Sequence, residues 1–454
     1  MSKEGRISMK DVLDEIFKAY DVRGKVGEQL NDEVVFGIAR AFADWLPAEG
    51  PVAVGYDMRP DSKNFADAFI KGLVQQGRDV WDIGRIATDM IYFAVGANGL
   101  AGGAVITASH NPGEYNGIKL CRQEAQPVSG DTGLFDIKDK VINHSYKQVA
   151  NRGVITKHNV VDDWINHVLT FVDTAKYQPL RIAVDAGNGM AGEIFAEIEP
   201  YVPWEVTEMY FEPDGTFPNH EANPLKIETL KDIAKEIQDN NLDGGIAFDG
   251  DGDRAFLVDE KGEQLPASVV QALISEFYLK RSPGAKIVYE VRTSHSVRDT
   301  IIANGGVPVV TKAGHSNIKQ AMRQQDVIFG SEASGHYFFK DNWYADSGLI
   351  AAMIALYVIS LKNKKFSEIK KEFTLYAAIP EVNFTVKDKT ETLVKIKQAY
   401  ADAIVDELDG VTVTLKDGWF NVRPSNTEPL LRLNAEATTK QKLDAIVNQV
   451  TKFL

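Results

Sequence analysis

The sequence predicts an α/β protein in which three related α/β domains are followed by a smaller α+β domain. Three short β-branched runs each end in a glycine-rich or small polar loop, at residues 52–62, 181–192 and 286–296. Three further runs begin with a Gly-Gly pair, at residues 102, 244 and 305. Strand–loop–helix units in this rhythm are typical of α/β domains, which bind ligands beyond the carboxyl ends of their strands. The chain length of 454 residues leaves room for three or four domains.

The C-terminal part of the chain has a different pattern. Apolar residues recur there at helical spacing, at Leu393, Ile396, Tyr400, Ile404 and Leu408. Two strand candidates follow, "VTVTL" and "WFNV", and then come the loop "RPSNTEP", another strand and a closing helix. We therefore expect four domains, with boundaries at 1–154, 155–259, 260–371 and 372–454.

The composition narrows the class of protein. The formal net charge of −14 argues against a nucleic-acid partner, which would require a basic surface. A single cysteine, Cys121, excludes an intramolecular disulfide and a multi-cysteine metal site. The N-terminus has no hydrophobic signal core, and the apolar run 348–361 is too short to span a bilayer. We expect a cytoplasmic protein with no membrane partner, in which 348–361 is a buried helix.

A serine follows one of the predicted strands. The segment "GGAVITASHNPGEYNGIK" places Ser109, His110 and Asn111 directly after an apolar run, and Pro112 then fixes the exit of the loop. Ser109 could be a nucleophile, or the segment could be an ordinary turn that uses Ser and Asn for local hydrogen bonds. The chain has no G-x-S-x-G motif, so a hydrolase elbow is not supported. Lys119 is close enough in sequence to supply charge to the same cavity.

The loop "DGDGDR" predicts a metal site. Asp249, Asp251 and Asp253 follow an apolar strand at alternate positions, and the intervening glycines permit a tight turn. Three close carboxylates repel one another unless a cation neutralises them, and oxygen ligands suit Mg²⁺ or Ca²⁺. An EF-hand is disfavoured because Arg254 stands where that loop needs glycine. An aspartyl nucleophile and a plain polar hairpin turn are the other interpretations.

The segment "GSEASGHYFF" suits the binding of a sugar. Glu332, Ser334 and His336 occupy alternate positions, which would place them on one side of an extended segment. A carboxylate next to a hydroxyl can hold sugar hydroxyls, and His336 could move a proton near neutral pH. A surface turn is the alternative.

The loop "RPSNTEP" suits a phosphate dianion. It combines a guanidinium, hydroxyls, an amide and backbone N–H groups, and the return strand adds a second arginine. The candidate ligands are Arg423, Ser425, Asn426, Thr427 and Arg432. A turn built from Pro, Ser and Asn is the alternative.

A glycine motif supports a competing class of protein. "GNGMAG" fits the dinucleotide-binding pattern G-x-G-x-x-G at Gly187, Gly189 and Gly192, with Glu208 and Glu212 about 20 residues further on. This pattern would indicate a nucleotide-dependent oxidoreductase. That interpretation leaves "DGDGDR" and "RPSNTEP" without a role, so we keep it as a minor alternative.

Taken together in their order, "TASHNP", "DGDGDR", "EASGH" and "RPSNTEP" resemble the motifs of the α-D-phosphohexomutase superfamily, in particular its bacterial phosphomannomutase/phosphoglucomutase branch. "FKAYDVRG", "NGIK" and "KAGHSNIK" add to the resemblance. It implies four domains around a central cleft and a phosphorylated Ser109 that binds Mg²⁺ together with the three aspartates. It also implies that Glu332 and Ser334 hold sugar hydroxyls and that Arg423, Ser425, Asn426 and Thr427 grip the phosphate that does not react. Four further residues would line the cleft: Tyr20, Arg23, Arg292 and His315.

The resemblance also implies an activity, that of an intramolecular phosphotransferase acting on small phosphosugars. Phosphoserine would convert a hexose 1-phosphate into a hexose 1,6-bisphosphate, which is both intermediate and activator, and then into the 6-phosphate. Mg²⁺, Arg254 and Lys119 would neutralise charge, and Lys119, His110 or His336 would move the proton. The sugar loop reads Ser331-Glu332-Ala333, where family members often have Gly-Glu-Met, so mannose, glucose and glucosamine all stay open. A non-catalytic protein that binds metal and sugar phosphate is the remaining alternative, and we expect a monomer or a weak dimer.

Overall fold

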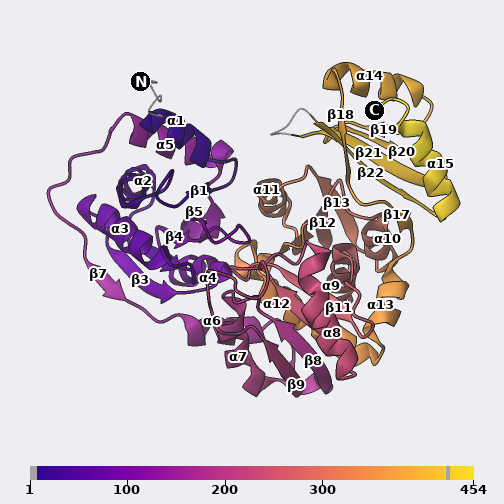
Figure 1. Ribbon diagram of the computed structural model, residues 1–454, viewed down its shortest axis with the longest axis horizontal. Helices are drawn as coiled ribbons and strands as arrows, with labels where there is room; N and C mark the ends of the chain where they lie inside the picture. The colour runs from indigo at the N-terminus through magenta and orange to yellow at the C-terminus, as the bar shows by residue number, and fades with distance from the viewer. Residues whose placement is uncertain (1–7, 426–429) are drawn as a thin grey trace, which may run out of the picture. The chain divides into compact units, whose positions relative to one another are not determined.

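The computed structural model describes residues 8–425 and 430–454, and the chain divides into two compact units. The first unit contains Met1–Gln264 together with Phe338–Asn363. The second contains Leu265–Tyr337 together with Lys364–Leu454. Helices and β-sheets occur in both units, so the predicted α/β class is confirmed (Figure 1).

The first sheet of the first unit has the strand order β1-β5-β4-β2-β3-β7, with the short β6 beside β5. The neighbours β4, β2, β3 and β7 are parallel to one another. Strand β5 is antiparallel to both β1 and β4. The strands are β1 (Val22–Lys25), β2 (Val52–Tyr56), β3 (Val80–Arg85), β4 (Gly102–Ile106), β5 (Tyr115–Arg122), β6 (Gln126–Pro127) and β7 (Ile155–Lys157). The helices are α1 (Met9–Ile16), α2 (Asp32–Trp45), α3 (Ser62–Gln75), α4 (Thr88–Asn98) and α5 (Leu134–Ile142).

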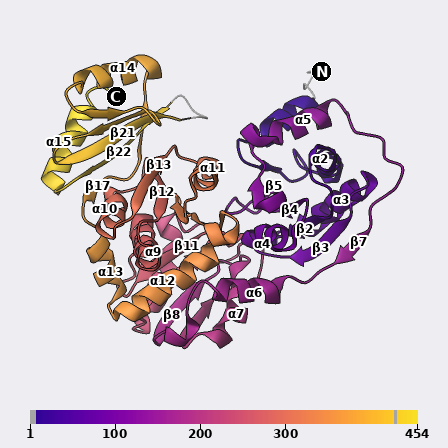
Figure 2. The same ribbon diagram turned by 180° about the vertical axis from the view of Figure 1, so that it is seen from behind.

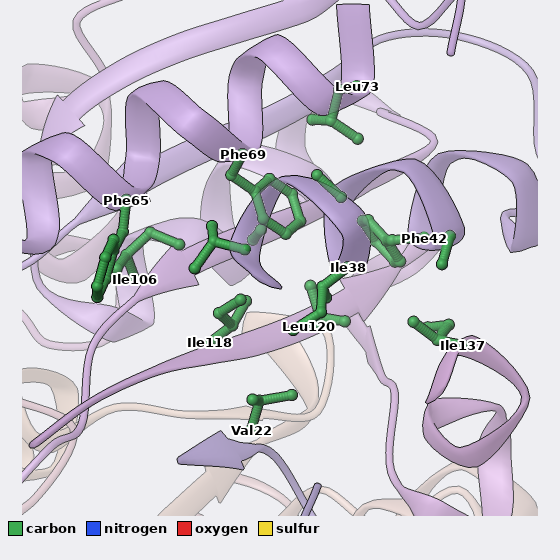
Figure 3. Close-up of a cluster of buried hydrophobic side chains, with 14 of the residues drawn as sticks. Val22, Ile38, Phe42, Phe65, Phe69, Leu73, Ile106, Ile118, Leu120 and Ile137 are labelled. Atoms are coloured by element: carbon green, nitrogen blue, oxygen red, sulfur yellow. The ribbon is translucent and has the colours of Figure 1, made fainter. Parts of the chain in front are cut away.

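Helices cover both faces of this sheet. On one face, side chains of α2, α3 and α5 pack against alternate residues of the strands, including Ile106, Ile118 and Leu120 (Figure 3). The rings of Phe42 and Phe69 are 6.2 Å apart at the centre of this core. On the other face, α4 lies so close to β4 that only glycine fits at Gly103, where a Cβ would come within 2.9 Å of two α4 side chains. A rigid sheet therefore carries the loops at its strand ends.

The second sheet of the first unit has the order β11-β10-β8-β9. Its strands β9, β8 and β10 are parallel, and β11 returns antiparallel to β10 as a hairpin. The strands are β8 (Leu180–Asp185), β9 (Trp204–Met209), β10 (Gly244–Phe248) and β11 (Ala255–Asp259). The helices are α6 (Val161–Leu169), α7 (Ala191–Ile198) and α8 (Lys231–Asp239).

The chain returns to the first unit within β15 (Tyr337–Phe339), which pairs with β16 (Ala345–Asp346) and leads into α12 (Gly348–Lys362). Helix α12 is buried from Gly348 to Ser360 and contacts β11 and α6, which confirms the predicted buried helix (Figure 2). In the described part of the chain, no helix combines the length and apolar character needed to cross a bilayer.

The second unit begins with a parallel sheet in the order β13-β12-β14. Its strands are β12 (Lys286–Glu290), β13 (Val307–Thr311) and β14 (Phe329–Ser331). The helices that follow or precede them are α9 (Ala267–Arg281), α10 (His295–Ala303), α11 (His315–Gln325) and α13 (Phe366–Phe373).

The chain ends in an antiparallel sheet with the order β17-β22-β21-β20-β19, in which β18 also pairs with β22. Its strands are β17 (Ala377–Ala378), β18 (Val382–Thr385), β19 (Ile404–Asp406), β20 (Val411–Thr414), β21 (Gly418–Pro424) and β22 (Leu430–Ala437). The helices are α14 (Lys389–Ala399) and α15 (Lys440–Val450). One expectation was wrong here: the helix ends at Ala399, and Ile404 begins β19 with 73% exposure, so the apolar spacing overran the helix end.

The recurring runs in the sequence correspond to paired strands. The strand of each β-branched run lies parallel to the strand of the next Gly-Gly run, as β2 beside β4, β8 beside β10 and β12 beside β13. This repeated pairing confirms that three α/β domains share one design, and the fourth domain is α+β as predicted.

Candidate active site

Ser109 lies in the loop between β4 and β5, shortly after β4 ends at Ile106. Its backbone is left-handed, with φ of 49°, a conformation that costs a non-glycine residue about 1 kcal/mol or more. Its amide donates to Thr107 Oγ1 at 2.9 Å, and its hydroxyl donates to Asp249 Oδ2 at 2.9 Å. The strand thus delivers a serine hydroxyl, 3% exposed, to the acidic loop of the next domain.

The three aspartates occupy the hairpin loop between β10 and β11. Asp249, Asp251 and Asp253 are all buried, and one carboxylate oxygen from each lies within 4.8 Å of the others. The flanking elements are strands, so the EF-hand interpretation, which needs helices, does not apply. Buried carboxylates at this separation repel strongly unless positive charge compensates them.

The aspartate cluster fits a divalent metal ion. Asp251 Oδ2 accepts hydrogen bonds from Thr88 Oγ1 and from Lys119 Nζ, each at 2.6 Å. Its other oxygen, Oδ1, is buried and has no hydrogen-bond partner among the described residues. A set of carboxylate oxygens with one uncommitted buried lone pair is the donor set that hard cations such as Mg²⁺ prefer.

Two cations already lie among the acids. Lys119, on β5, places its Nζ 2.6 Å from both Asp251 Oδ2 and Asp253 Oδ2. Arg254 donates to Asp249 Oδ2 from Nε at 2.9 Å and from a terminal nitrogen at 2.7 Å, and it is 2% exposed. The structure therefore brings Ser109, Lys119, Arg254 and the aspartates together.

Burial and charge set the protonation of these groups. Burial raises the pKa of Asp249 to about 6, although the nearby Arg254 opposes the rise. Burial alone would lower the pKa of Lys119, but the carboxylates of Asp251 and Asp253 raise it well above its ordinary value. This shift favours the ammonium form of Lys119 at neutral pH.

His110 is held in its neutral form. Burial, followed by the positive charges of Arg254 and Arg23, lowers the pKa of His110 to about 3. Its Nδ1 lies 2.5 Å from a terminal nitrogen of Arg254 and 3.1 Å from Ser109 Oγ. Because a guanidinium can only donate, Nδ1 is the acceptor and the ring proton resides on Nε2.

Of the two N-terminal candidates, Arg23 reaches the serine loop. A terminal nitrogen of Arg23 donates to Asn111 Oδ1 at 2.5 Å and to the Ala108 carbonyl at 3.3 Å, while its Nε donates to Asp21 at 2.8 Å. Tyr20 lies just before β1 and is 36% exposed.

In the second unit, the sugar-binding candidates gather around Glu332. Ser334 Oγ donates to Glu332 Oε2 at 2.9 Å, and His336 Nδ1 lies 3.3 Å from the same oxygen. Arg292 lies 3.6 Å from Glu332 Oε1, which also accepts the Gly314 amide at 3.1 Å. Burial would raise the pKa of Glu332, but His336, Arg292 and His315 together hold it well below its usual range.

The backbone of this loop differs from the expectation. Residues 332–336 form a tight turn between β14 and β15, with the Glu332 amide bonded to the His336 carbonyl at 3.0 Å. Glu332, Ser334 and His336 converge because the turn folds them together, and not because they alternate along an extended segment.

The phosphate-binding candidates lie on paired strands. Arg423 and Arg432 are register partners on β21 and β22, and both contact one carboxylate, that of Glu381, at 2.7 Å and 3.5 Å. Arg432 also donates to Ser425 Oγ at 3.3 Å. Asn426 and Thr427, predicted for the same loop, lie outside the described residues.

Sequence reasoning missed four residues that support these groups: Arg59, Thr88, Glu290 and Glu381. The Thr88 hydroxyl donates to Asp251. Arg292 Nε donates to Glu290 at 2.8 Å, and a terminal nitrogen of Arg423 donates to Glu381. Arg59 and Glu290 carried a signal, because both lie in β-branched runs that lead into polar residues, "VAVGYDMRPDS" and "KIVYEVRTSHS". Thr88 and Glu381 depend on contacts between residues far apart in the chain.

The glycines of "GNGMAG" serve the acidic loop. Gly187 has a φ of 54°, and a Cβ at Gly189 would lie 2.6 Å from the carbonyl oxygen of Gly250. The Met190 amide donates to that carbonyl at 3.0 Å. The glycine pattern that suggested a dinucleotide site instead lets this backbone pack closely against the loop that carries the aspartates.

A left-handed serine just after a strand, beside a buried carboxylate cluster with two cations, is the candidate active site of this multidomain α/β protein. The sequence matches four consecutive domains of one family, described as phosphoglucomutase/phosphomannomutase alpha/beta/alpha domains I, II and III and C-terminal domain. The matched residues are 14–147, 162–262, 262–376 and 381–453. The chain belongs to the phosphoglucomutase/phosphomannomutase family.

Individual relatives agree over nearly the whole chain. A phosphomannomutase of Escherichia coli is 39% identical over 432 residues, which cover 93% of this chain and 94% of the relative. The phosphohexose mutases of Xanthomonas campestris are 37% identical over 425 residues, covering 92% and 94%. A crystal structure of a phosphoglucomutase/phosphomannomutase family protein from Burkholderia thailandensis superposes with a TM-score of 0.90 at 30% identity, covering 99% of this chain and 98% of that one.

Proposed function

We propose that this protein is a phosphosugar mutase that interconverts the 1-phosphate and the 6-phosphate of mannose, of glucose or of both. The observation that carries the proposal is the Ser109 hydroxyl, which lies 2.9 Å from Asp249 in a buried acidic cluster. Membership of the family and the names of the relatives, phosphomannomutase and phosphohexose mutases, support the same reaction.

In the proposed cycle, Ser109 carries a phosphoryl group between turnovers. The bond from phosphorus to the serine oxygen breaks as a bond to a free sugar hydroxyl forms. The hydroxyl proton passes to a base, and the departing serine oxygen takes up a proton in turn. The product is a hexose 1,6-bisphosphate, which turns end for end and returns its other phosphoryl group to Ser109. The bisphosphate therefore also serves as the activator of an unphosphorylated enzyme.

Charge neutralisation falls to a small set of groups. Asp249, Asp251 and Asp253, with the phosphorylated serine, would hold Mg²⁺, which when bound offsets charge on the transferring group. Arg254 and Lys119 supply two further positive charges at fixed positions. Phosphoryl transfer depends mainly on such positioning and neutralisation.

Lys119, His110 and His336 are the candidates for moving the hydroxyl proton. The raised pKa of Lys119 favours a charge-stabilising role for it, because it keeps its proton. Because the Nδ1 of His110 faces Arg254, a proton transfer by His110 would have to use Nε2.

We assign the remaining predicted residues to substrate binding. Glu332, Ser334 and His336 would hold sugar hydroxyls. Arg423, Ser425 and Arg432, with Asn426 and Thr427, would hold the phosphate that is not reacting. A single distal grip suffices, because both ends of the sugar take their turn at Ser109. The other proposed substrate contacts are Tyr20, Arg23, Arg292 and His315.

³¹P NMR tests the proposal. We expect protein mixed with Mg²⁺, a trace of glucose 1,6-bisphosphate and either mannose 1-phosphate or glucose 1-phosphate to produce the corresponding 6-phosphate signal. The two rates then give the sugar preference. Unchanged spectra with mannose 1-phosphate, glucose 1-phosphate and glucosamine 1-phosphate would contradict the mutase assignment.

Ser109→Ala provides the matched variant. We expect its isomerisation rate to fall below about one thousandth of the wild-type rate, because the group that carries the phosphoryl is gone. The circular dichroism spectrum should be unchanged, because the substitution removes one oxygen atom. Full activity in a folded Ser109→Ala protein would contradict the role of the serine.

A further inference from the structure

We propose that Arg59 is a positioning residue that locks the Ser109 loop into the shape required for phosphoryl transfer, an inference that rests on the proposed function. Arg59 follows β2 in the first domain and is 3% exposed. Among the described residues it makes no hydrogen bond to the acidic cluster, unlike Arg254 and Lys119, although the charge of Asp251 acts on it. Its guanidinium lies among the backbone carbonyls of the loop that presents the serine.

The terminal nitrogens of Arg59 hold four carbonyl oxygens of that loop. One donates to the carbonyls of Ser109 at 2.8 Å and Asn111 at 2.6 Å. The other donates to the carbonyls of Pro112 at 2.9 Å and Tyr115 at 2.8 Å. A planar, rigid fork of donors thus fixes the course of the backbone from residue 109 to residue 115.

The loop needs such support for two reasons. Ser109 is left-handed, and strained backbone persists only where its surroundings determine it strongly. Pro112 has no N–H group and interrupts regular pairing, so the carbonyls around it depend on donors from outside the strand ladder. Arg59 answers both needs, because one of its four bonds is to the carbonyl of the strained residue itself.

The charge of Arg59 is balanced locally, which separates its role from that of the catalytic cations. Its Nε lies 3.3 Å from Asp57 Oδ2, and both side chains are 1% exposed. Asp57 Oδ1 in turn accepts the Arg59 amide at 3.0 Å. The geometry of the guanidinium is therefore what matters, and a lysine, which keeps the charge but loses the fork, should not replace it.

The neighbouring domain covers this arrangement. The ring centre of Phe217 lies 5.3 Å from the Arg59 guanidinium carbon, within the range of a cation–π contact. A Cβ at Gly215 would come within 2.4 Å of the Arg59 Cα. These contacts help to bury the Arg59 side chain, which is 1% exposed.

The chain provides a matched control. Arg78 uses its guanidinium in the same way, donating to the carbonyls of Ala43 at 3.0 Å, Ala48 at 2.7 Å and Leu46 at 2.9 Å, at the end of α2. Arg59→Lys and Arg78→Lys therefore remove the same kind of backbone clamp from the same domain. Only the first removes it from the serine loop.

The experiment is single-turnover transfer of ³²P from labelled glucose 1,6-bisphosphate to Ser109, followed by steady-state kinetics. We expect Arg59→Lys to slow the transfer and to lower kcat by about 10- to 100-fold, because small displacements of a reacting group have effects of this size. KM should change by less than about twofold, because the substrate contacts are untouched. Arg78→Lys should transfer at the wild-type rate.

A wild-type transfer rate in Arg59→Lys would overturn the inference, and so would an equal loss in Arg78→Lys. If Arg59→Lys does not fold, Asp57→Asn takes its place, because it removes the carboxylate that lies 3.3 Å from Arg59 Nε and holds the guanidinium against the loop. Slower transfer in that variant supports the clamp, and an unchanged rate refutes it. Absence of label on the wild-type protein would refute the proposed function itself, and the inference with it.

Discussion

The two carboxylate oxygens of Asp251 have different surroundings. Oδ2 is committed to Thr88 and Lys119, whereas Oδ1 is buried with no hydrogen-bond partner in the described part of the chain. The Thr88 hydroxyl thereby fixes the rotation of the carboxylate, and its amide also bonds the Asp251 carbonyl at 2.9 Å. Groups that orient a ligand in this way commonly control metal affinity.

Replacing Thr88 should therefore weaken the metal site. We expect Thr88→Val to lower the affinity for Mg²⁺ or Mn²⁺ by about tenfold or more, because Asp251 loses the bond that aims it. Titration calorimetry with Mg²⁺, or electron paramagnetic resonance with Mn²⁺, measures this without any turnover. Thr88→Ser keeps the hydroxyl and should bind like the wild type; equal affinity in the Val and Ser variants would contradict the assignment.

At the residue scale, sequence predicts best where the chemistry is local. Asp249, Asp251 and Asp253 were identifiable because repulsion among neighbouring carboxylates follows from their spacing alone. Thr88 and Arg59 act on residues 163 and 50 or more positions away along the chain. No local pattern shows which distant residues such a threonine or arginine contacts.

Among the elements, the segment that follows β9 links a titratable group to the acidic loop. His220 Nε2 lies 3.0 Å from Asp185 Oδ2 at the end of β8, and its Nδ1 lies 2.9 Å from the Glu221 carbonyl. Nearby, the Ala222 carbonyl accepts the Gly250 amide at 3.2 Å. Both ring nitrogens face oxygen acceptors, which is the environment of a protonated imidazole.

This contact predicts a pH-dependent stability. Burial would lower the pKa of His220, but the hydrogen bond and charge of Asp185 outweigh it and raise the pKa above its unfolded value. The folded state thus binds the proton more tightly, so the stabilisation is fully present below about pH 6 and is lost as pH rises through the folded pKa. Melting temperatures of the wild type and His220→Asn should differ most at acidic pH and converge at alkaline pH.

His144 provides the control for that series. It is exposed and, in the described part of the chain, has no carboxylate partner like the Asp185 that faces His220. We expect the melting temperature of His144→Asn to track the wild type at every pH. A difference in melting temperature between the wild type and His220→Asn that stays constant with pH would contradict a protonated His220 paired with Asp185.

At the same scale, strands were predicted better than loop shapes. The β-branched and Gly-Gly runs gave the parallel pairs of all three α/β domains, because a buried strand has a distinct composition. The predicted conformation of 332–336 was wrong, and so was the predicted length of α14. Alternation suits a tight turn as well as a strand, and apolar residues of β19 continued the helical spacing by coincidence.

For the whole molecule, the order of the motifs predicted more than any single motif. Four motifs in a fixed order indicated the family, which the four matched domains confirm. The first unit contains the serine, the aspartates and two cations, and the second contains the Glu332 cluster and the Arg423–Arg432 pair. The net charge of −14 gave no hint of these local cations, because each lies next to acidic side chains that offset it.

The central claim is that Ser109 carries the phosphoryl group, and mass spectrometry of the peptide containing Ser109 tests it most directly. Protein incubated with Mg²⁺ and glucose 1,6-bisphosphate should carry phosphate on Ser109, and addition of glucose 6-phosphate should discharge it into newly formed bisphosphate. Isomerisation that proceeds with Ser109 unmodified, or with the phosphate on Asp249 instead, would contradict the account.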